Sequence, residues 1–403
     1  MMPALPKLMD SRRRITPRRL LLAACLGLAA GLLLFFLAAV PVSETYLNGV
    51  AGARPRQVSG RALALHRSLF VADMHADTLL WGRDLLARGS RGHVDLPRLR
   101  EGNAALQIFT VVTKVPRGLS VERNSADSDV VGWIALANRW PRRTWGSLRE
   151  RALFQAAQLH AAARDSNGQL VLIRTAADLA GFVERRKREP QIVAAVLGVE
   201  GAHALEGDLA NLDALHGAGF RMIAPTHFFD TEIGGSASGL EKYGLTELGR
   251  EFVRRVEARG MIVDLAHASG RTIDDVCSMA TRPVVVSHTG VRGTCDNNRN
   301  LDDGRVRKIA ATGGVVGIGF WPTATCGRDA RSIARAIRYT ASLVGARHVA
   351  LGSDFDGAVS APFDAAGLAA VTDALIEEGF SDEEIEMIMG GNVLRVLLET
   401  LPR

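Results

Sequence analysis

The sequence predicts an α/β fold, a (β/α)8 TIM-like barrel, preceded by an N-terminal transmembrane helix. Three observations support this prediction: short apolar runs rich in Val and Ile recur along the chain, helical patterns separate them, and several runs end in His, Asp or Glu. Runs without polar alternation are typical of strands that are buried on both faces of a parallel sheet. Strands that alternate with helices along most of a chain favour a barrel.

Eight candidate strands alternate with helical patterns. The strands are expected at 69–73, 105–112, 192–199, 222–226, 261–265, 284–287, 314–319 and 349–352. Helices are expected at 245–259, 333–344 and 365–378, and a longer helical region at 125–163 separates the second strand from the third. An open doubly wound sheet is the alternative, but no phosphate-binding P-loop and no dinucleotide-binding glycine motif follows a strand.

The N-terminal segment combines a basic head with an apolar run. The first 20 residues carry six Lys and Arg side chains against Asp10, which is +5 of the formal net charge of +6. Residues 20–40 follow without a charge, and about 20 apolar residues can span a bilayer. Because the basic residues precede the run, its N-terminal end should stay in the cytoplasm.

We therefore expect four parts: a basic cytoplasmic head at 1–19, a transmembrane signal-anchor at 20–42, a tether at 43–59 and a barrel domain at 60–403. The expected location is the inner (cytoplasmic) membrane, with a single pass and the barrel on the periplasmic or extracellular side. Cleavage near residues 38–40 is the alternative. A lipoprotein site at Cys25 and a twin-arginine signal at 11–15 fit the sequence less well.

Charge and cysteine usage limit the partners and the compartment. Outside the basic head the net charge is only +1, and a nucleic-acid-binding domain needs a basic patch, so no nucleic-acid partner is expected. Cys277, Cys295 and Cys326 lie beyond the anchor. An oxidising compartment permits a bridge between Cys295 and Cys326, but the spacing does not determine which cysteines pair.

Six strand-like runs end in residues that can bind a metal or move a proton. The endings lie at 73–77, 199–201, 225–227, 264–267, 286–288 and 352–356. In a (β/α)8 barrel the C-terminal strand ends form the active-site mouth. The endings therefore predict a single site there, as in barrels of the metal-dependent hydrolase type.

Five of these residues are candidate metal ligands. His75 and Asp77 are one residue apart, so in an extended backbone they point to the same side and can bind one ion. Glu200 has two carboxylate oxygens and can bridge two cations. His267 and His288 offer imidazoles to the second ion. The alternatives are a hydrogen-bonded strand-end histidine, an aspartate that caps a turn, and a buried salt bridge at Glu200.

A second group of residues could act on the substrate. Asp354 could move a proton to the leaving amine, and His227 could stabilise an oxyanion. The guanidinium of Arg299 suits a substrate carboxylate. As alternatives, Asp354 could cap a helix, and Arg299 could be a surface arginine paired with Asp302 or Asp303. The chain has no G-x-S-x-G motif, so a serine nucleophile is not expected.

Over residues 60 to 400 the chain resembles the membrane dipeptidase (renal dipeptidase) family of binuclear zinc peptidases, in a bacterial-type form. The shared motifs are Asp-x-His-x-Asp (73–77), Gly-Val-Glu-Gly (198–201), Thr-His (226–227), Tyr-Gly-Leu-Thr-x-x-Gly (243–249), Asp-Leu-Ala-His (264–267), Ser-His (287–288), Arg-Asn-x-x-Asp (299–303), Gly-Ser-Asp-Phe-Asp-Gly (352–357) and Gly-Gly-Asn (390–392). Each motif alone is weak, but the whole set in this order is specific.

The resemblance implies two zinc ions per subunit in a TIM-like barrel. By its motifs, His75 and Asp77 would bind one zinc, His267 and His288 the other, and Glu200 would bridge them. The catalytic and substrate-binding roles would fall to His227, Arg299 and Asp354 as described above. In mammalian relatives a disulfide joins cysteines at the positions of Cys295 and Cys326. Segment 113–160 carries no motif of the family.

The expected function is hydrolysis of dipeptides with a free C-terminal carboxylate, through a hydroxide that bridges two zinc ions. A related enzyme that acts on a non-peptide amide, such as an N-acyl amino acid or a lactam, is the alternative. A membrane-tethered binding protein would lack metal ligands, and none is missing. The preferred dipeptide, the tolerance of D-residues and a homodimeric state stay open, and the ligand set also admits manganese or cobalt.

Overall fold

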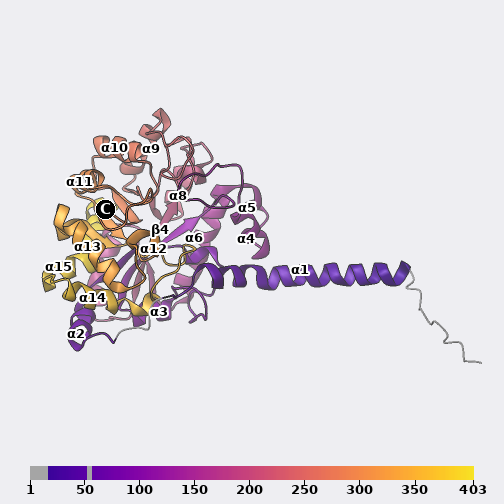
Figure 1. The fold of residues 1–403 in the computed structure, drawn as a ribbon, viewed down its shortest axis with the longest axis horizontal. Coiled ribbons are helices and arrows are strands. Elements are labelled where there is room, and N and C mark those ends of the chain that lie inside the picture. Colours follow the sequence, from indigo (N-terminus) through magenta and orange to yellow (C-terminus); the bar gives the residue numbers. More distant parts are fainter. Residues whose placement is uncertain (1–16, 52–56) are drawn as a thin grey trace, which may run out of the picture.

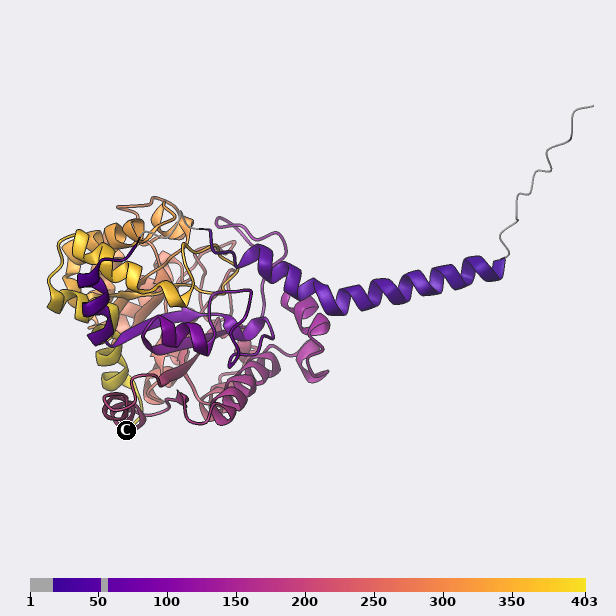
Figure 2. The same ribbon diagram turned by 90° about the horizontal axis from the view of Figure 1, so that it is seen from below.

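A computed structural model describes residues 17–51 and 57–403, in which a long helix projects from an α/β domain (Figure 1). The helix, α1 (Pro17–Leu47), is the one helix of the described residues that is long and apolar enough to cross a membrane. The head predicted at 1–19 lies mostly outside the described residues. Figure 2 shows that only the C-terminal end of α1 lies against the domain.

Eight parallel strands form the barrel, which confirms the predicted fold class. They are β1 (Val71–Ala76), β2 (Ala104–Val112), β4 (Val193–Glu200), β5 (Phe220–Ile223), β6 (Ile262–Val263), β7 (Val285–Thr289), β8 (Val315–Ile318) and β9 (Val349–Leu351). Their order is β6-β5-β4-β2-β1-β9-β8-β7. A parallel bridge between Asp264 and Val285 joins the two outer strands, β6 and β7, and closes the barrel.

The sequence did not predict a ninth strand, β3 (Leu170–Leu172), which pairs with the first half of β4. It is only three residues long, and β5 pairs with the second half of the same strand. β3 therefore extends the sheet locally without entering the ring of eight strands.

Helices surround the barrel. They are α2 (Gly60–Ser68), α3 (Leu96–Glu101), α4 (Val131–Ala137), α5 (Arg143–Gly146), α6 (Leu148–Asp165), α7 (Ala176–Arg186), α8 (Asn211–Gly217), α9 (Glu247–Ala258), α10 (Gly270–Met279), α11 (Asp303–Ala311), α12 (Pro322–Thr325), α13 (Ala330–Val344), α14 (Ala369–Glu377), α15 (Asp382–Glu386) and α16 (Asn392–Thr400). The helical region expected at 125–163 is divided into α4, α5 and α6. Pro141 separates the first two, and the Ser147 side chain caps α6 by accepting a hydrogen bond from the Glu150 N–H.

The alternation of side chains along β4 explains why its last residue reaches the barrel interior. Val193, Ala195 and Leu197 pack toward the surrounding helices, whereas Ala194 and Val196 belong to the cluster inside the barrel. Successive strand residues point to opposite faces, so Glu200 continues the inward series. Side chains of α16 pack on the opposite, N-terminal end of the same inner cluster, which leaves the C-terminal strand ends as the open mouth.

Packing of the outer helices on the barrel predicts that truncating a buried aromatic side chain of α9 will strongly lower stability. Phe252 is fully buried, so Phe252→Ala should lower the free energy of unfolding by about 3–5 kcal/mol. The exposed Arg254 of the same helix provides the control Arg254→Ala, for which we expect a change within about 0.5 kcal/mol. Urea unfolding of the full chain in detergent measures both; equal midpoints would contradict the packing described.

Candidate active site

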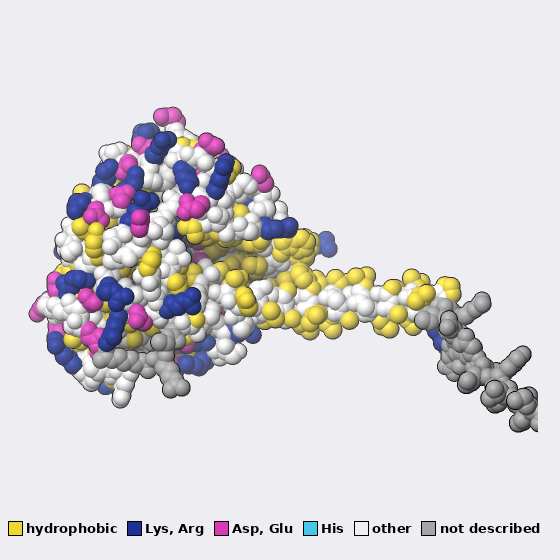
Figure 3. Space-filling view, in the orientation of Figure 1, with side chains coloured by type: hydrophobic (Ala, Val, Ile, Leu, Met, Phe, Trp, Pro, Cys, Tyr) yellow, Lys and Arg dark blue, Asp and Glu magenta, His cyan; other side chains and the backbone are white. Residues whose placement is uncertain are grey.

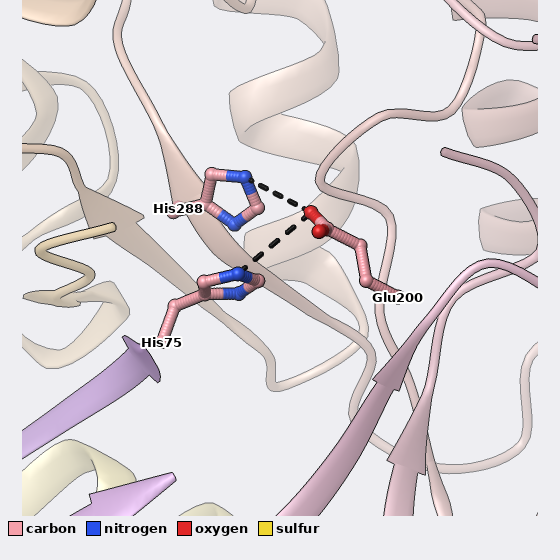
Figure 4. A group of neighbouring side chains, drawn as sticks. All are labelled: His75, Glu200 and His288. Atoms are coloured by element: carbon pink, nitrogen blue, oxygen red, sulfur yellow. Dashed lines mark ion pairs between the residues drawn. The ribbon is translucent and has the colours of Figure 1, made fainter. Parts of the chain in front are cut away.

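The carboxylate of Glu200 lies at the centre of a group of imidazoles at the barrel mouth. Its Oε1 atom lies 3.7 Å from His75 Nε2 and 3.4 Å from His288 Nε2, and Figure 4 shows that both rings direct a nitrogen toward it. His267 Nε2 lies 2.8 Å from the same oxygen. The other oxygen, Oε2, lies 3.1 Å from His227 Nε2. One carboxylate from β4 is thus surrounded by side chains that lie at the ends of β1 and β7 or follow β5 and β6.

Two further carboxylates complete the site on the side of His75. His75 Nε2 lies 3.4 Å from Asp77 Oδ1 and 4.0 Å from Asp354 Oδ1. Thr110 of β2 donates a hydrogen bond of 2.6 Å to Asp77 and so orients that carboxylate. Potential ligand atoms form three overlapping groups: His75 with Asp77 and Asp354, His75 with Glu200 and His288, and Glu200 with His227 and His267.

Ser287 fixes the orientation of two histidines at once. Its hydroxyl donates to Asp264 Oδ2 at 2.6 Å, so its lone pairs are free to accept from His75 Nδ1 at 3.0 Å and His288 Nδ1 at 2.9 Å. Both Nδ1 atoms can therefore donate to this hydroxyl, and both Nε2 atoms face the site. A cation bound there would displace the proton that the surrounding carboxylates hold on His75 Nε2. Metal-binding histidines commonly have such a partner on their other nitrogen.

Burial and mutual repulsion shape the charge of the carboxylates. Burial raises the pKa of Glu200 well above its ordinary value, and the neighbouring Asp77 carboxylate raises it further. Burial also raises the pKa of Asp354 to about 8. Burial opposes a charge on His75, but Asp77, Glu200 and Asp354 outweigh it and raise the pKa of His75 to about 10. The three carboxylates around His75 Nε2 therefore favour a positive charge at that position.

The other histidines are neutral. Burial holds the pKa values of His227, His267 and His288 well below the ordinary value, and nearby cationic groups lower them further. A neutral imidazole can coordinate a metal, whereas a protonated one cannot. His203 lies beside His227 with ring centroids 6.4 Å apart, and burial lowers the pKa of His203 to about 3.

The residues present fit a pair of divalent cations. His267 Nε2 and His288 Nε2 lie 3.0 Å apart, and His75 Nε2 is buried without a hydrogen-bond partner. Nitrogen atoms that converge on carboxylate oxygens in this way form the N/O donor set that zinc uses in catalytic sites. The five predicted ligands, His75, Asp77, Glu200, His267 and His288, all lie in this cluster.

Arg299 is buried rather than on the surface, in contrast to the alternative considered from sequence. Its guanidinium donates to the carbonyl of Ala266 at 2.6 Å and to that of His288 at 3.0 Å, and it lies 5.7 Å from the centre of the Trp321 ring. Asp302 instead pairs with Arg305. The side chain thus faces the site cavity from a fixed position.

A disulfide and an asparagine hold the loop that carries Arg299. Cys295 and Cys326 are bonded to each other. The Asn300 side-chain amide donates to the Cys295 carbonyl at 2.7 Å and accepts from the Gly290 N–H at 3.0 Å. The loop is therefore attached to the strand end of β7 and to α12 at the same time.

Asp354 does not cap a helix; it lies in a loop held by Asp356. The backbone of Asp354 has a φ of +60°, in the left-handed region that is unfavourable for most residues. The Asp356 carboxylate accepts from Thr78 Oγ1 at 2.8 Å, from the His93 N–H at 2.6 Å and from Arg83 Nη2 at 2.5 Å. These bonds offset the cost of the strained backbone and fix the Asp354 side chain in the mouth.

The site opens into a cavity of about 870 Å³. Its inner end is lined by polar residues of the site, among them Asp77, Glu200, Arg299 and Asp354. Its outer wall is largely apolar and includes Leu80, Trp81, Val112, Val115, Leu119, Trp133, Ile134 and Leu47. The cavity therefore combines charged groups suited to a substrate's polar groups with a largely apolar wall.

A barrel with histidines and carboxylates at its mouth defines a metal-dependent hydrolase, and comparisons with known proteins identify its family. The model of the membrane dipeptidase family (peptidase family M19) matches residues 59–401. The chain belongs to this family of metal-dependent peptidases. The resemblance noted in the sequence is thereby confirmed.

Individual relatives agree with the family. Dipeptidase aclJ of Aspergillus oryzae is 30% identical over 316 residues, which cover 76% of this chain and 69% of the relative. The crystal structure of a metallo-peptidase named dipeptidase AC has a TM-score of 0.69 and 25% identity, and covers 83% of this chain and 100% of its own. A metallo-peptidase from Rhodobacter sphaeroides, solved with a phosphinate mimic of the dipeptide L-Ala-D-Ala, has a TM-score of 0.67 and 25% identity, with coverage of 82% and 99%.

The bonding of Ser287 predicts its effect on metal affinity. Ser287→Ala removes the acceptor for two Nδ1–H groups, so the rings of His75 and His288 lose their fixed orientation. Loss of such a partner typically lowers metal affinity about 10–100-fold. Competition with a chromophoric chelator measures the zinc affinity, and Ser342→Ala, at an exposed serine of α13, is the control. An unchanged affinity in Ser287→Ala would show that the hydroxyl does not orient the ligands.

Proposed function

We propose that this chain is a membrane-anchored metallo-dipeptidase that hydrolyses dipeptides with a free C-terminal carboxylate. The observation that carries the proposal is the convergence of His75, His267 and His288 on Glu200. Glu200 lines one cavity together with Arg299. The first four residues supply metal ligands, and the fifth supplies a fixed cation for a substrate anion. Together they fit a hydrolase that acts on small peptides with a free carboxylate.

His75 and Asp77 would hold one zinc ion and His267 and His288 the other, with Glu200 shared between them. When bound, two such ions lower the pKa of a shared water toward neutrality and polarise the scissile carbonyl. The Ser287 hydroxyl would orient the rings of His75 and His288 through their Nδ1 atoms, so that both Nε2 atoms face the ions. Asp77 is directed to the same place by its hydrogen bond from Thr110.

The remaining side chains would position the substrate and move its protons. Arg299 keeps two of its donors on backbone carbonyls and has others for a carboxylate, which would place the scissile bond one residue away. Neutral His227 directs Nε2 into the site and can donate a hydrogen bond to an oxyanion. Asp354, whose pKa is raised by burial, can take up a proton and release it to the leaving amine.

The helix α1 would anchor the enzyme in the cytoplasmic membrane, with the barrel on the outer side of that membrane. Residues 20–34 of α1 are exposed and without a charged side chain, and six basic residues precede or begin the helix. A surface of this kind is stable in lipid rather than in water.

A second candidate is an amidase of the same mechanism that acts on an N-acyl amino acid or a lactam. The observation that favours it is the apolar outer wall of the cavity, where Leu80, Trp81 and Val115 could contact an acyl group that a small dipeptide lacks. A panel that pairs dipeptides with N-acyl amino acids distinguishes the two functions by kcat/KM.

Glu200→Gln tests the metal-centred mechanism. The amide keeps the shape of the side chain but removes the negative charge that two cations would share, so kcat/KM should fall by more than about 100-fold, since outer partners of a metal site alone contribute about 10–100-fold. Metal content, measured by mass spectrometry of the purified protein, should fall as well. Glu101→Gln, at an exposed glutamate of α3, is the control. Wild-type turnover in Glu200→Gln would refute the mechanism.

Arg299→Ala tests the capture of the substrate carboxylate. The wild-type enzyme should prefer a free dipeptide to the same dipeptide with a C-terminal amide, and Arg299→Ala should lower kcat/KM for the free form by about 30-fold or more, as expected for loss of a buried charge partner. The two substrates should then be cleaved at similar rates. Arg307→Ala, at an exposed position of α11, should keep the preference. A preference that survives in Arg299→Ala would assign the carboxylate to another group.

A further inference from the structure

The end of α1 is built into the domain rather than connected by a flexible tether. Glu44 is fully buried and pairs with Arg83 and with Arg91, the latter at 3.2 Å. Val40 and Asn48 are also buried. Because these contacts come from the last turns of α1 and from the residue that follows it, the direction in which α1 leaves the domain is fixed.

The loop and helices between β2 and α6 lie beside the C-terminal part of the apolar run of α1. Phe35 and Ala39 of α1 pack against the cluster that contains Val131 and Trp140, and the guanidinium of Arg139 lies 5.5 Å from the centre of the Phe36 ring. In Figure 1, α4 and α5 lie next to α1 where it meets the domain. This is the segment for which the sequence offered no family motif.

The length of the helix places this contact at the level of the lipid. Leu20 and Phe36 are separated by about 24 Å along the axis, at about 1.5 Å per residue. The hydrocarbon core of a bilayer is about 30 Å thick. If the hydrocarbon core of the bilayer begins at Leu20, it extends past Phe36. Side chains of the domain that pack against Phe36 must therefore reach the boundary between lipid and water.

The surface of this segment has the composition of a membrane interface. Trp133 and Trp145 are 56% and 47% exposed, and Leu119 is 45% exposed. Arg139, Arg142 and Arg143 are exposed on the same stretch of chain. Trp is enriched at the boundary between lipid and water, and Lys and Arg near the surface attract anionic headgroups. Figure 3 shows hydrophobic side chains gathered where α1 joins the domain.

We propose that Leu119, Trp133 and Trp145, together with the three arginines of 139–143, form a lipid-docking face. The face rests in the headgroup layer of an anionic phospholipid bilayer beside α1, and this inference depends on the anchoring proposed above. Ser43 and Leu47 of α1 line the active-site cavity together with Leu119 and Trp133. The cavity therefore opens at the membrane surface, and the anchor helix forms part of its wall.

Quenching of tryptophan fluorescence tests the face in the full chain. The protein is reconstituted in vesicles of phosphatidylcholine and phosphatidylglycerol, with lipids brominated near the headgroup end of their acyl chains. The other tryptophans, Trp81, Trp140 and Trp321, are at most 8% exposed. We expect strong quenching by the brominated lipid and weak quenching by aqueous iodide, and the double variant W133F/W145F should lose more than half of the lipid quenching.

A matched control places a tryptophan on a distant surface. Leu398 of α16 is 41% exposed, and L398W in the double-variant background should be quenched by iodide and not by brominated lipid. Lipid quenching that is unchanged in W133F/W145F, or iodide quenching of Trp133 and Trp145 as strong as that of L398W, would overturn the docking face.

Flotation of the same vesicles separates the two proposals. Protein that floats but shows no lipid quenching retains its anchor and lacks the docking face. Protein that does not float has lost the anchor, and the docking face is then refuted with it. Hydrolysis of a soluble dipeptide, measured in detergent, reports on the active site independently of both results.

Discussion

Negative charge buried at the barrel mouth is the constraint on which the rest of the site depends. Asp77, Glu200 and Asp354 are all buried within reach of a single histidine nitrogen. Carboxylates are not stable in such a place unless cations or hydrogen-bond donors compensate them. The same carboxylates raise the pKa of His75, because they stabilise a positive charge on its ring. Bound divalent cations would supply this positive charge, and the other polar groups of the mouth surround the positions that such ions would occupy.

Closure of the barrel and orientation of the ligands depend on one residue. The backbone of Asp264 forms the bridge that joins β6 to β7. Its carboxylate accepts from the N–H of Ser287 at 2.8 Å and from the hydroxyl of Ser287 at 2.6 Å. That hydroxyl in turn accepts from His75 and His288. A shift between these two strands would therefore misalign ligands of both proposed metal ions, which couples the stability of the barrel to its chemistry.

The barrel and the residues at its mouth could be predicted from the sequence, because buried parallel strands and polar strand ends are both local patterns. Contacts between side chains of different strands could not be predicted in this way. Ser287 and Asp264 were noted only as parts of motifs, since their roles depend on side chains far away in sequence. The position of Arg299 could not be decided from a polar loop. Glu44 looked like part of a tether, because the arginines that neutralise it follow about 40 residues later.

The burial of Glu44 has a consequence for release of the domain from the membrane. Arg83 contacts both Glu44 and Asp356, and Asp356 holds the loop that presents Asp354. A proteolytic cut ahead of the last turn of α1 would free the domain but leave that turn as a frayed end. Loss of the turn would leave Arg83 with one carboxylate instead of two and remove part of the cavity wall. Shedding would thus yield a soluble enzyme with an altered catalytic loop and substrate entrance.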